Sequence, residues 1–346
     1  MKGAELRHQI LDRGLRVVKR PAEKHNAPFT PLDHEVLMSG ERVTFNLYLK
    51  VADGRGGEVK FVPYLEEGER LEPNWLRNLQ RLGVHQLFFH NPDLEKVVAY
   101  LNNHLLKASH PPGSPVKELA IMREHLACSL QMAFTAPKLG QHVALAKKPL
   151  ANLLKVLQRD RLSWKLLLEI LYRDYTLYYH SVNVAILAMA MGAFLKRSQK
   201  ECLQLGLAGL FHDVGLTKIP EEITDKGEPL TPEDWEMLKK HPCFGFRLLK
   251  GNAAVPITSL KLILEHHENA DGSGYPQGLE LKRQHPLTRI LAVVEAYDGL
   301  TIYRPYRRKY SPFEAMKILQ AERGGKGGNA YDPKTLLKFI EFLAIS

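Results

Sequence analysis

The sequence predicts two domains of different class, a small α+β domain followed by an all-α bundle. Three observations support this division. Within residues 1–106, apolar and polar side chains alternate with a period of two, as they do in half-buried strands. Residues 107–117 contain three prolines, a glycine and two serines, a composition typical of a linker. From residue 118 to residue 346, apolar side chains recur with helical spacing instead. A chain of 346 residues can bury two separate cores.

The N-terminal region predicts a β-hairpin and then a helix, a strand and a second helix. The expected strands are 44–51, 58–65 and 84–89, and the expected helices are 71–82 and 93–106. The sequence ADGRGG joins the first two strands and has the composition of a turn. The first 20 residues have dispersed charges and no apolar segment, which predicts a basic amphipathic helix instead of a secretory signal. We expect this domain to sense a signal, dock a partner or dimerise.

The second region predicts a series of helices separated by short polar turns. The expected helical segments are 166–171, 182–195, 201–210, 257–267, 287–300 and 312–319. A further helix starts at Thr231-Pro232, because threonine is a favoured cap and proline is favoured at the first helical position. Gly324–Asn329 is rich in glycine, and we interpret it as a flexible loop because no Ser or Thr follows its lysine as in a phosphate-binding loop.

Composition and charge exclude several classes of protein. No apolar run reaches the ~18 residues of a membrane span. The three cysteines, Cys128, Cys202 and Cys243, are scattered, so we expect no disulfide framework and a cytoplasmic location. The net charge is +10, with the densest basic run at Arg304–Lys309. No zinc finger, basic zipper or RNA-binding signature accompanies that charge, so we expect an anionic small ligand and no nucleic acid.

Histidines and carboxylates gather at the ends of the apolar helices in the second region. They are His180, His212, Asp213, His241, His266, His267, Glu268, Glu295 and Asp298. A single helical histidine is more often a surface residue than a ligand, but helices that converge in a bundle are a common way to build a dinuclear site. Imidazole mixed with carboxylate favours iron, manganese or zinc over calcium. Gly272 and Gly274 permit a tight turn that would hold Tyr275 over such a site.

The order of these motifs resembles the HD-GYP family, a branch of the HD phosphohydrolases known as cyclic di-GMP phosphodiesterases. The matching stretches are HSVNVA at 180–185, FHDVG at 211–215, Leu230 to Gly245, HHENADGSGYPQGL at 266–279 and Arg289 to Arg307, with Ala330–Pro333 at the end. The N-terminal domain lies outside the resemblance. The resemblance implies that the second domain is an HD-type helical bundle.

Residue by residue, the resemblance implies a ligand set for two divalent ions. The metal ligands are His180, His212, Asp213, His241, His266, His267 and Glu295, where Glu295 replaces the family's usual aspartate. Asp213 would bridge the ions, and iron or manganese is favoured, with zinc, nickel or cobalt as further choices. The resemblance implies His212 and Asp213 as catalytic residues, with nearby Lys218 as a further candidate. It implies substrate binding by Tyr275, Arg304 and Arg307, and Asp174 is a further candidate.

Two departures from the family pattern bear on activity. Leu216 stands where the family has a lysine that contacts the scissile phosphate, and such a contact is worth a few kcal/mol in the transition state. Thr176 stands where some members hold a third metal with glutamate. We therefore expect slow hydrolysis of cyclic di-GMP to pGpG, with GMP as a further product.

Other functions stay open from the sequence. One alternative is a catalytically degenerate cyclic di-GMP receptor that acts through protein–protein signalling. Another is an HD-type phosphohydrolase acting on a different nucleotide. The resemblance also leaves open GGDEF-type or other regulatory protein partners and a homodimer.

Overall fold

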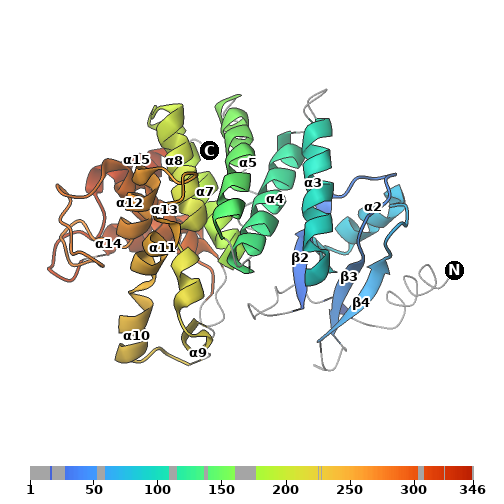
Figure 1. Ribbon diagram of the computed structural model, residues 1–346, viewed down its shortest axis with the longest axis horizontal. Helices are drawn as coiled ribbons and strands as arrows, with labels where there is room; N and C mark the ends of the chain where they lie inside the picture. Colours follow the sequence, from blue (N-terminus) through green and yellow to red (C-terminus); the bar gives the residue numbers. More distant parts are fainter. Residues whose placement is uncertain are drawn as a thin grey trace. The chain divides into compact units, whose positions relative to one another are not determined.

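The computed structural model describes residues 16–17, 28–52, 59–108, 115–135, 139–159, 177–224, 226, 228–302, 308–322 and 324–344. It divides into two compact units, Met1–Cys128 and Ser129–Ser346 (Figure 1). The first unit contains the strands and the second is helical, which confirms the predicted fold class. Residues 109–114, in the middle of the predicted linker, lie outside the described residues, so the domain boundaries at 106 and 118 stay a prediction.

The first unit is built on an antiparallel sheet. Its strands are β1 (Arg16–Val17), β2 (Phe29–Asp33), β3 (Leu47–Ala52), β4 (Val59–Leu65) and β5 (Gln86–His90). Strand β3 pairs with β1, β4 and β5, and β2 pairs with β5 along its whole length. The helices are α2 (Pro73–Arg81) and α3 (Leu94–Ala108), with short 3-10 turns η1 (His34–Val36) and η2 (Asn91–Asp93). The predicted hairpin, its following strand and both helices are therefore confirmed.

The two faces of this sheet carry different apolar side chains. Leu32, Leu87 and Phe89 are fully buried in the core of the unit. On strands β2 and β4, Phe29 stacks on Phe61 with ring centroids 4.2 Å apart. The sequence prediction missed β2, because a proline in a five-residue strand weakens the alternating pattern. The predicted helix over residues 1–20 is wrong in the part that is described, since Arg16–Val17 form β1.

The second unit is a bundle of helices. Besides the end of α4 (Pro115–Thr135), its described elements are α5 (Leu139–Arg159), α7 (Leu177–Phe194), α8 (Gln199–Phe211), η3 (Val214–Lys218), α9 (Glu221–Thr224), α10 (Pro232–Leu238), α11 (His241–Leu249), α12 (Ile257–Glu265), α13 (Pro286–Thr301), α14 (Pro312–Ala321) and α15 (Pro333–Ala344). Five of the predicted segments and the Thr231 cap are confirmed, and 166–171 lies outside the described residues. Helices α5, α11 and α15 were not predicted individually.

Helix α7 is the centre of this bundle. All its side chains from Tyr179 to Met191 are buried, because the sequence is apolar around the whole helix. Gly209 of α8 lies so close to α7 that a Cβ there would approach the Ala185 backbone to 2.8 Å. Figure 1 shows α5, α7 and α8 side by side. Ser198 and Glu201 form a reciprocal cap that fixes where α8 begins.

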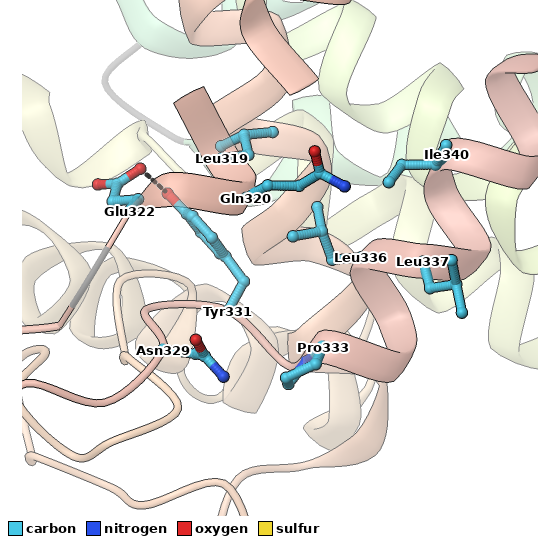
Figure 2. A pocket seen from close by; sticks show the side chains of 9 residues that line it. All are labelled: Leu319, Gln320, Glu322, Asn329, Tyr331, Pro333, Leu336, Leu337 and Ile340. Carbon is cyan, nitrogen blue, oxygen red and sulfur yellow. Dashed lines mark hydrogen bonds between the residues drawn. The ribbon is translucent and has the colours of Figure 1, made fainter. Parts of the chain in front are cut away.

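A cavity of about 330 Å³ lies between α14, α15 and the segment that joins them (Figure 2). Its lining residues are Leu319, Gln320, Glu322, Asn329, Tyr331, Pro333, Leu336, Leu337 and Ile340. Among the described helices of either unit, none has both the length and the apolar character needed to cross a lipid bilayer.

Candidate metal centre

The end of α8 brings His212 and Asp213 into the bundle. Helix α8 ends at Phe211, His212 is fully buried, and η3 begins directly after Asp213. The next residue but one, Gly215, packs so tightly on α11 that a Cβ would collide with the carbonyl oxygen of His241. Glycine at 215 therefore lets the start of α11, with His241, lie beside the HD pair. The adjacent His212 and Asp213 at the end of the apolar helix α8 thus face His241 at the start of α11.

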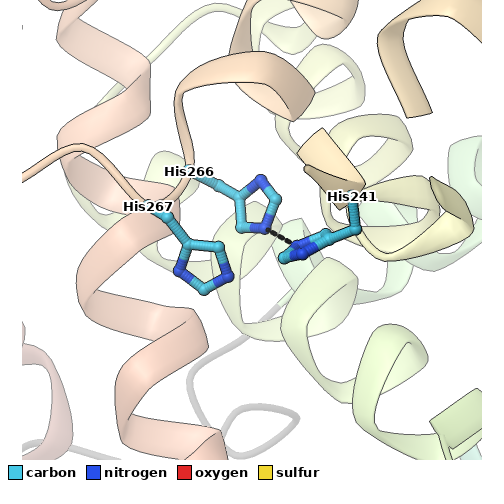
Figure 3. A group of neighbouring side chains, drawn as sticks. All are labelled: His241, His266 and His267. Carbon is cyan, nitrogen blue, oxygen red and sulfur yellow. Dashed lines mark hydrogen bonds between the residues drawn. The ribbon is translucent and has the colours of Figure 1, made fainter. Parts of the chain in front are cut away.

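Two groups of possible ligands form around Asp213. His180, His212 and Asp213 have ligand atoms within 4.8 Å of one another, and so do His241, His266 and His267 (Figure 3). Asp213 faces both groups. Its Oδ2 lies 3.2 Å from His212 Nε2, while its Oδ1 lies 3.4 Å from His241 Nε2 and 4.0 Å from His266 Nε2. A carboxylate in that place can bridge two ions.

Helix α13 supplies the carboxylates on the side of His180, which itself lies on α7. Glu295 Oε1 lies 4.0 Å from His180 Nε2, so the longer glutamate side chain does reach this group. Asp298 Oδ2 accepts a hydrogen bond from His180 Nδ1 at 2.7 Å, and its Oδ1 accepts one from Asn183 Nδ2 at 3.1 Å. The sequence had matched Asp298 to a family motif without giving it a role, and it had not singled out Asn183. Helical spacing could have indicated both residues, since Asp298 lies three residues after Glu295 and Asn183 lies three residues after His180.

Backbone carbonyls orient three of the histidine rings. The Nδ1 atoms of His212, His241 and His266 each lie 2.8 Å from the carbonyl oxygen three residues earlier, of Gly209, Leu238 and Ile263. Since Nδ1–H donates to the carbonyl, Nε2 carries the lone pair in the neutral ring. All three Nε2 atoms then point into the centre, as metal-binding histidines require.

The donor set fits divalent metal ions. His212 Nε2 is buried, and the group nearest to it is the Asp213 carboxylate, whose Oδ2 lies 3.2 Å away. His241 Nε2 and His266 Nε2 lie 3.1 Å apart, with lone pairs facing each other in their neutral forms. Two nitrogens that distance apart, each about 2.1 Å from one ion, subtend about 95° there, close to the angle between neighbouring ligands in an octahedron. A cation would satisfy all three atoms.

Burial and charge set the protonation of these groups. Burial lowers the pKa of His266 and of His267 well below the usual value, and neighbouring histidines lower both further. Burial opposes the charged forms of His212 and Asp213 too. The attraction between these two outweighs that effect, so the pKa of His212 rises to about 9 and the pKa of Asp213 falls well below 3.8. His266 and His267 are therefore neutral, as metal ligands must be, whereas without metal His212 carries a proton near neutral pH and pairs with the ionised Asp213. A metal ion bound here displaces the proton of His212.

The loop after His267 holds Tyr275 beside the metal ligands. The Tyr275 ring centroid lies 4.8 Å from that of His267. Glu268 fixes the loop from inside, since its two oxygens accept hydrogen bonds from the backbone N–H groups of Gln277 and Leu279, both at 2.7 Å. Gly274 has no room for a side chain, because a Cβ would collide with the backbone of Asn269 and His267. The tight turn predicted from the glycines is thus present.

The glycine-rich segment 324–329 is bound to this same loop. Asp271 Oδ2 accepts from the Lys326 amide at 3.0 Å, and Ser273 Oγ accepts from the Gly325 amide at 2.7 Å. Gly324 lies against the Asp271 carboxylate with no space for a Cβ. The segment is therefore held in place by specific hydrogen bonds, in contrast to the flexible loop expected from its composition.

The remaining predicted residues are placed only in part. Lys218 is exposed at the end of η3, and Leu216 is half-buried with its amide bound to the Asp213 carbonyl. Arg304, Arg307 and Asp174 lie outside the described residues, and their predicted contacts with substrate stay predictions.

Comparison with known proteins agrees with this centre. The model of the HD domain family matches residues 157–334, which span every candidate metal ligand named above. The chain belongs to the HD domain family. Its match to the family starts within α5 and ends at the start of α15, so the first unit lies outside it.

Relatives and a solved structure place the chain more closely. It is 34% identical over 172 residues to a cyclic di-GMP phosphodiesterase of Pseudomonas aeruginosa, over 50% of this chain and 40% of the relative. It is 32% identical over 172 residues to a cyclic di-GMP phosphodiesterase of Thermotoga maritima, over 49% of this chain and 45% of the relative. The chain thus spans less than half the length of these two relatives.

The fold has a solved counterpart. A HDG"Y"P protein from Bdellovibrio bacteriovorus shares the fold with a TM-score of 0.68 at 20% identity, covering 91% of this chain and 99% of that one. This likeness confirms the fold, while the HD domain match and the cyclic di-GMP phosphodiesterase relatives confirm the family resemblance seen in the sequence.

Proposed function

We propose that the protein is a metal-dependent phosphodiesterase that slowly hydrolyses cyclic di-GMP to linear pGpG, with GMP as a further product. The observation that carries the proposal is the position of Asp213, whose two oxygens face two adjacent groups of imidazole ligands. The two relatives described above, which share the ligand-bearing half, are cyclic di-GMP phosphodiesterases.

The proposed ions are two, with iron or manganese favoured. One ion would be held by His180, His212 and Glu295, and the other would be held by His241, His266 and His267. Asp213 would bind both ions. Bound divalent ions supply Lewis-acid polarisation of a phosphoryl oxygen and lower the pKa of water. The reaction adds one water across one P–O3′ bond, and the proton ends on the departing 3′-oxygen.

The chain's own residues orient the substrate in this scheme. Tyr275 lies against His267, where its ring can pack on a base or ribose at the mouth of the centre. Arg304 and Arg307 bind phosphate oxygens bidentately, for which a planar guanidinium is suited. Asp174 contacts the ligand, and Lys218, two residues after Leu216, is the candidate for a positive charge near the phosphoryl group.

A receptor function is the second candidate, and Leu216 favours it. An apolar side chain at that position supplies no charge to the developing phosphoryl transition state. A protein of this kind would bind cyclic di-GMP and pass the signal to another protein, for which a GGDEF-type enzyme or a second copy of the chain is a candidate.

Product analysis separates the two functions. The purified protein, loaded with Mn²⁺ or Fe²⁺, is incubated with cyclic di-GMP, and the products are resolved by chromatography. The enzyme predicts pGpG from the wild type and none from Asp213→Asn, which keeps the side-chain shape. Tight binding without any pGpG would establish the receptor and refute the enzyme. We place the protein in the cytoplasm, in agreement with its three free cysteines.

A further inference from the structure

The cavity between α14 and α15 has one apolar end and one polar end. The apolar end is formed by Leu336, Leu337 and Ile340 of α15. The polar end is formed by Glu322, Asn329 and Tyr331, and the Gln320 amide extends toward the apolar end (Figure 2). None of these residues has a part in the mechanism above. A flat, largely apolar ligand with hydrogen-bonding groups along one edge is complementary to such a space.

Glu322 is the charged group of the polar end, and its orientation is set by a neighbour. The Tyr331 hydroxyl donates a hydrogen bond to Glu322 Oε2 at 3.2 Å, drawn as a dashed line in Figure 2. An ionised carboxylate is an acceptor only, so it selects a partner with N–H donors. Guanine presents two such donors side by side, N1–H and N2–H. Adenine presents an unprotonated ring nitrogen at the matching position, which a carboxylate repels.

The other walls suit the faces of a base. The Tyr331 ring is the aromatic surface of the cavity, and Pro333 and Leu336 add apolar surface. Nucleobases stack favourably on aromatic side chains. The side-chain amides of Asn329 and Gln320 carry both donors and acceptors, so each can hydrogen-bond a further polar atom of the ligand.

The segment that lines the cavity is hydrogen-bonded to the loop that follows the metal-ligand candidate His267. The carbonyl of Ala330, directly before Tyr331, accepts from the amide of Ala270 at 2.8 Å, three residues after His267. The hydrogen bonds from Lys326 and Gly325 to Asp271 and Ser273 hold the same segment on the loop that carries Tyr275.

Electrostatics gives a second link between the cavity and the centre. Burial raises the pKa of Tyr331, and the carboxylates of Glu322 and Glu295 raise it further. Glu295, a carboxylate of the metal centre, therefore acts electrostatically on the hydroxyl of Tyr331, which lines the cavity.

We propose that this cavity receives one guanine base of the cyclic dinucleotide, and that Glu322 selects guanine over adenine. The inference rests on the proposed function, in which the metal centre would hold a phosphate of the same dinucleotide. Tyr331 stacks on the base and orients the carboxylate, so it is a positioning residue as well as a contact.

Binding measurements with two dinucleotides test the proposal. Phosphorothioate analogues of cyclic di-GMP and cyclic di-AMP are titrated into the metal-loaded full chain by calorimetry, so that turnover does not consume the ligand. Glu322→Gln should weaken binding of the guanine analogue about 10- to 100-fold and leave the adenine analogue within about twofold. The matched control is Glu341→Gln, an exposed glutamate of α15 whose partner is Lys338. It should leave both affinities unchanged.

The outcomes distinguish this inference from the function on which it rests. Wild-type protein that binds the guanine analogue while Glu322→Gln binds it equally well would overturn the cavity's role and leave the proposed function intact. Wild-type protein that binds neither analogue would overturn the proposed function, and this inference with it. A loss of equal size for both analogues in Glu322→Gln would show a general effect on the site and would also overturn base selection.

Discussion

Asp298→Asn is expected to weaken metal binding at one half of the centre. The substitution keeps the shape of the side chain and removes its charge. Asp298 is 3% exposed and accepts from His180 Nδ1 at 2.7 Å, so the bond is buried and charge-assisted. Such bonds are worth about 1.5–3 kcal/mol, which corresponds to a loss of roughly 10- to 100-fold in affinity for the ion that His180 holds.

The size of the loss follows from what the carboxylate does for the ring. With Asp298 as acceptor, Nδ1 carries the proton and Nε2 faces Glu295 and the centre. An asparagine at this position accepts more weakly, and its amide nitrogen can turn toward the imidazole. The ring then loses both its fixed orientation and the basicity that a carboxylate partner gives it.

Isothermal titration of Mn²⁺ into chelator-treated protein measures the effect. The wild type should show two sites, and Asp298→Asn should retain one and weaken the other. The matched control is Asp332→Asn, since Asp332 is also a buried aspartate of this unit but bonds to Thr335 and lies 4.0 Å from Arg289 instead of a candidate ligand. Two sites of unchanged affinity in Asp298→Asn would refute the role assigned to this carboxylate.

Three further predictions concern the same half of the chain. Gly215→Ala should lower the free energy of unfolding by several kcal/mol and reduce the amount of bound metal, because the new Cβ meets the His241 carbonyl. Chemical denaturation measures the first effect, and an unchanged free energy of unfolding would show that η3 and α11 can separate. Leu216→Lys should raise the turnover number for cyclic di-GMP more than it changes ground-state binding, since charge at this loop acts mainly in the transition state. If Leu216→Lys leaves turnover unchanged while Lys218→Ala abolishes it, Lys218 already supplies that charge. Arg304→Ala or Arg307→Ala should each weaken cyclic di-GMP binding by roughly 1.5–3 kcal/mol and reduce its salt dependence, and equal calorimetric affinities would place the phosphates elsewhere.

The candidate ligand set was predictable because metal binding imposes residue types in a fixed order along the chain. His180, His212, Asp213, His241, His266 and His267 all converge, although up to 87 residues separate them in sequence. The helices between them were equally readable, since α7 and α8 are long and strongly apolar. Glu295 Oε1 lies 4.0 Å from His180 Nε2, and its role as a metal ligand stays a prediction.

The contacts that support these ligands were not predictable from the pattern. The backbone carbonyls that orient His212, His241 and His266 leave no trace in side-chain identity. The bond from Asp271 to the glycine-rich segment joins residues 55 positions apart, and a glycine-rich composition by itself favours flexibility. The short strand β2 was missed for a local reason, because Pro31 breaks the pattern that a longer strand would have shown.

Anomalous diffraction from crystals of manganese-loaded protein would show directly whether Asp213 lies in a dinuclear centre. We expect two peaks on opposite sides of Asp213, one among His180, His212 and Glu295 and the other among His241, His266 and His267. Loss of both peaks in His212→Ala/Asp213→Ala would tie them to the HD pair. A single peak, or peaks that do not touch Asp213, would contradict the dinuclear centre and the hydrolytic function built on it.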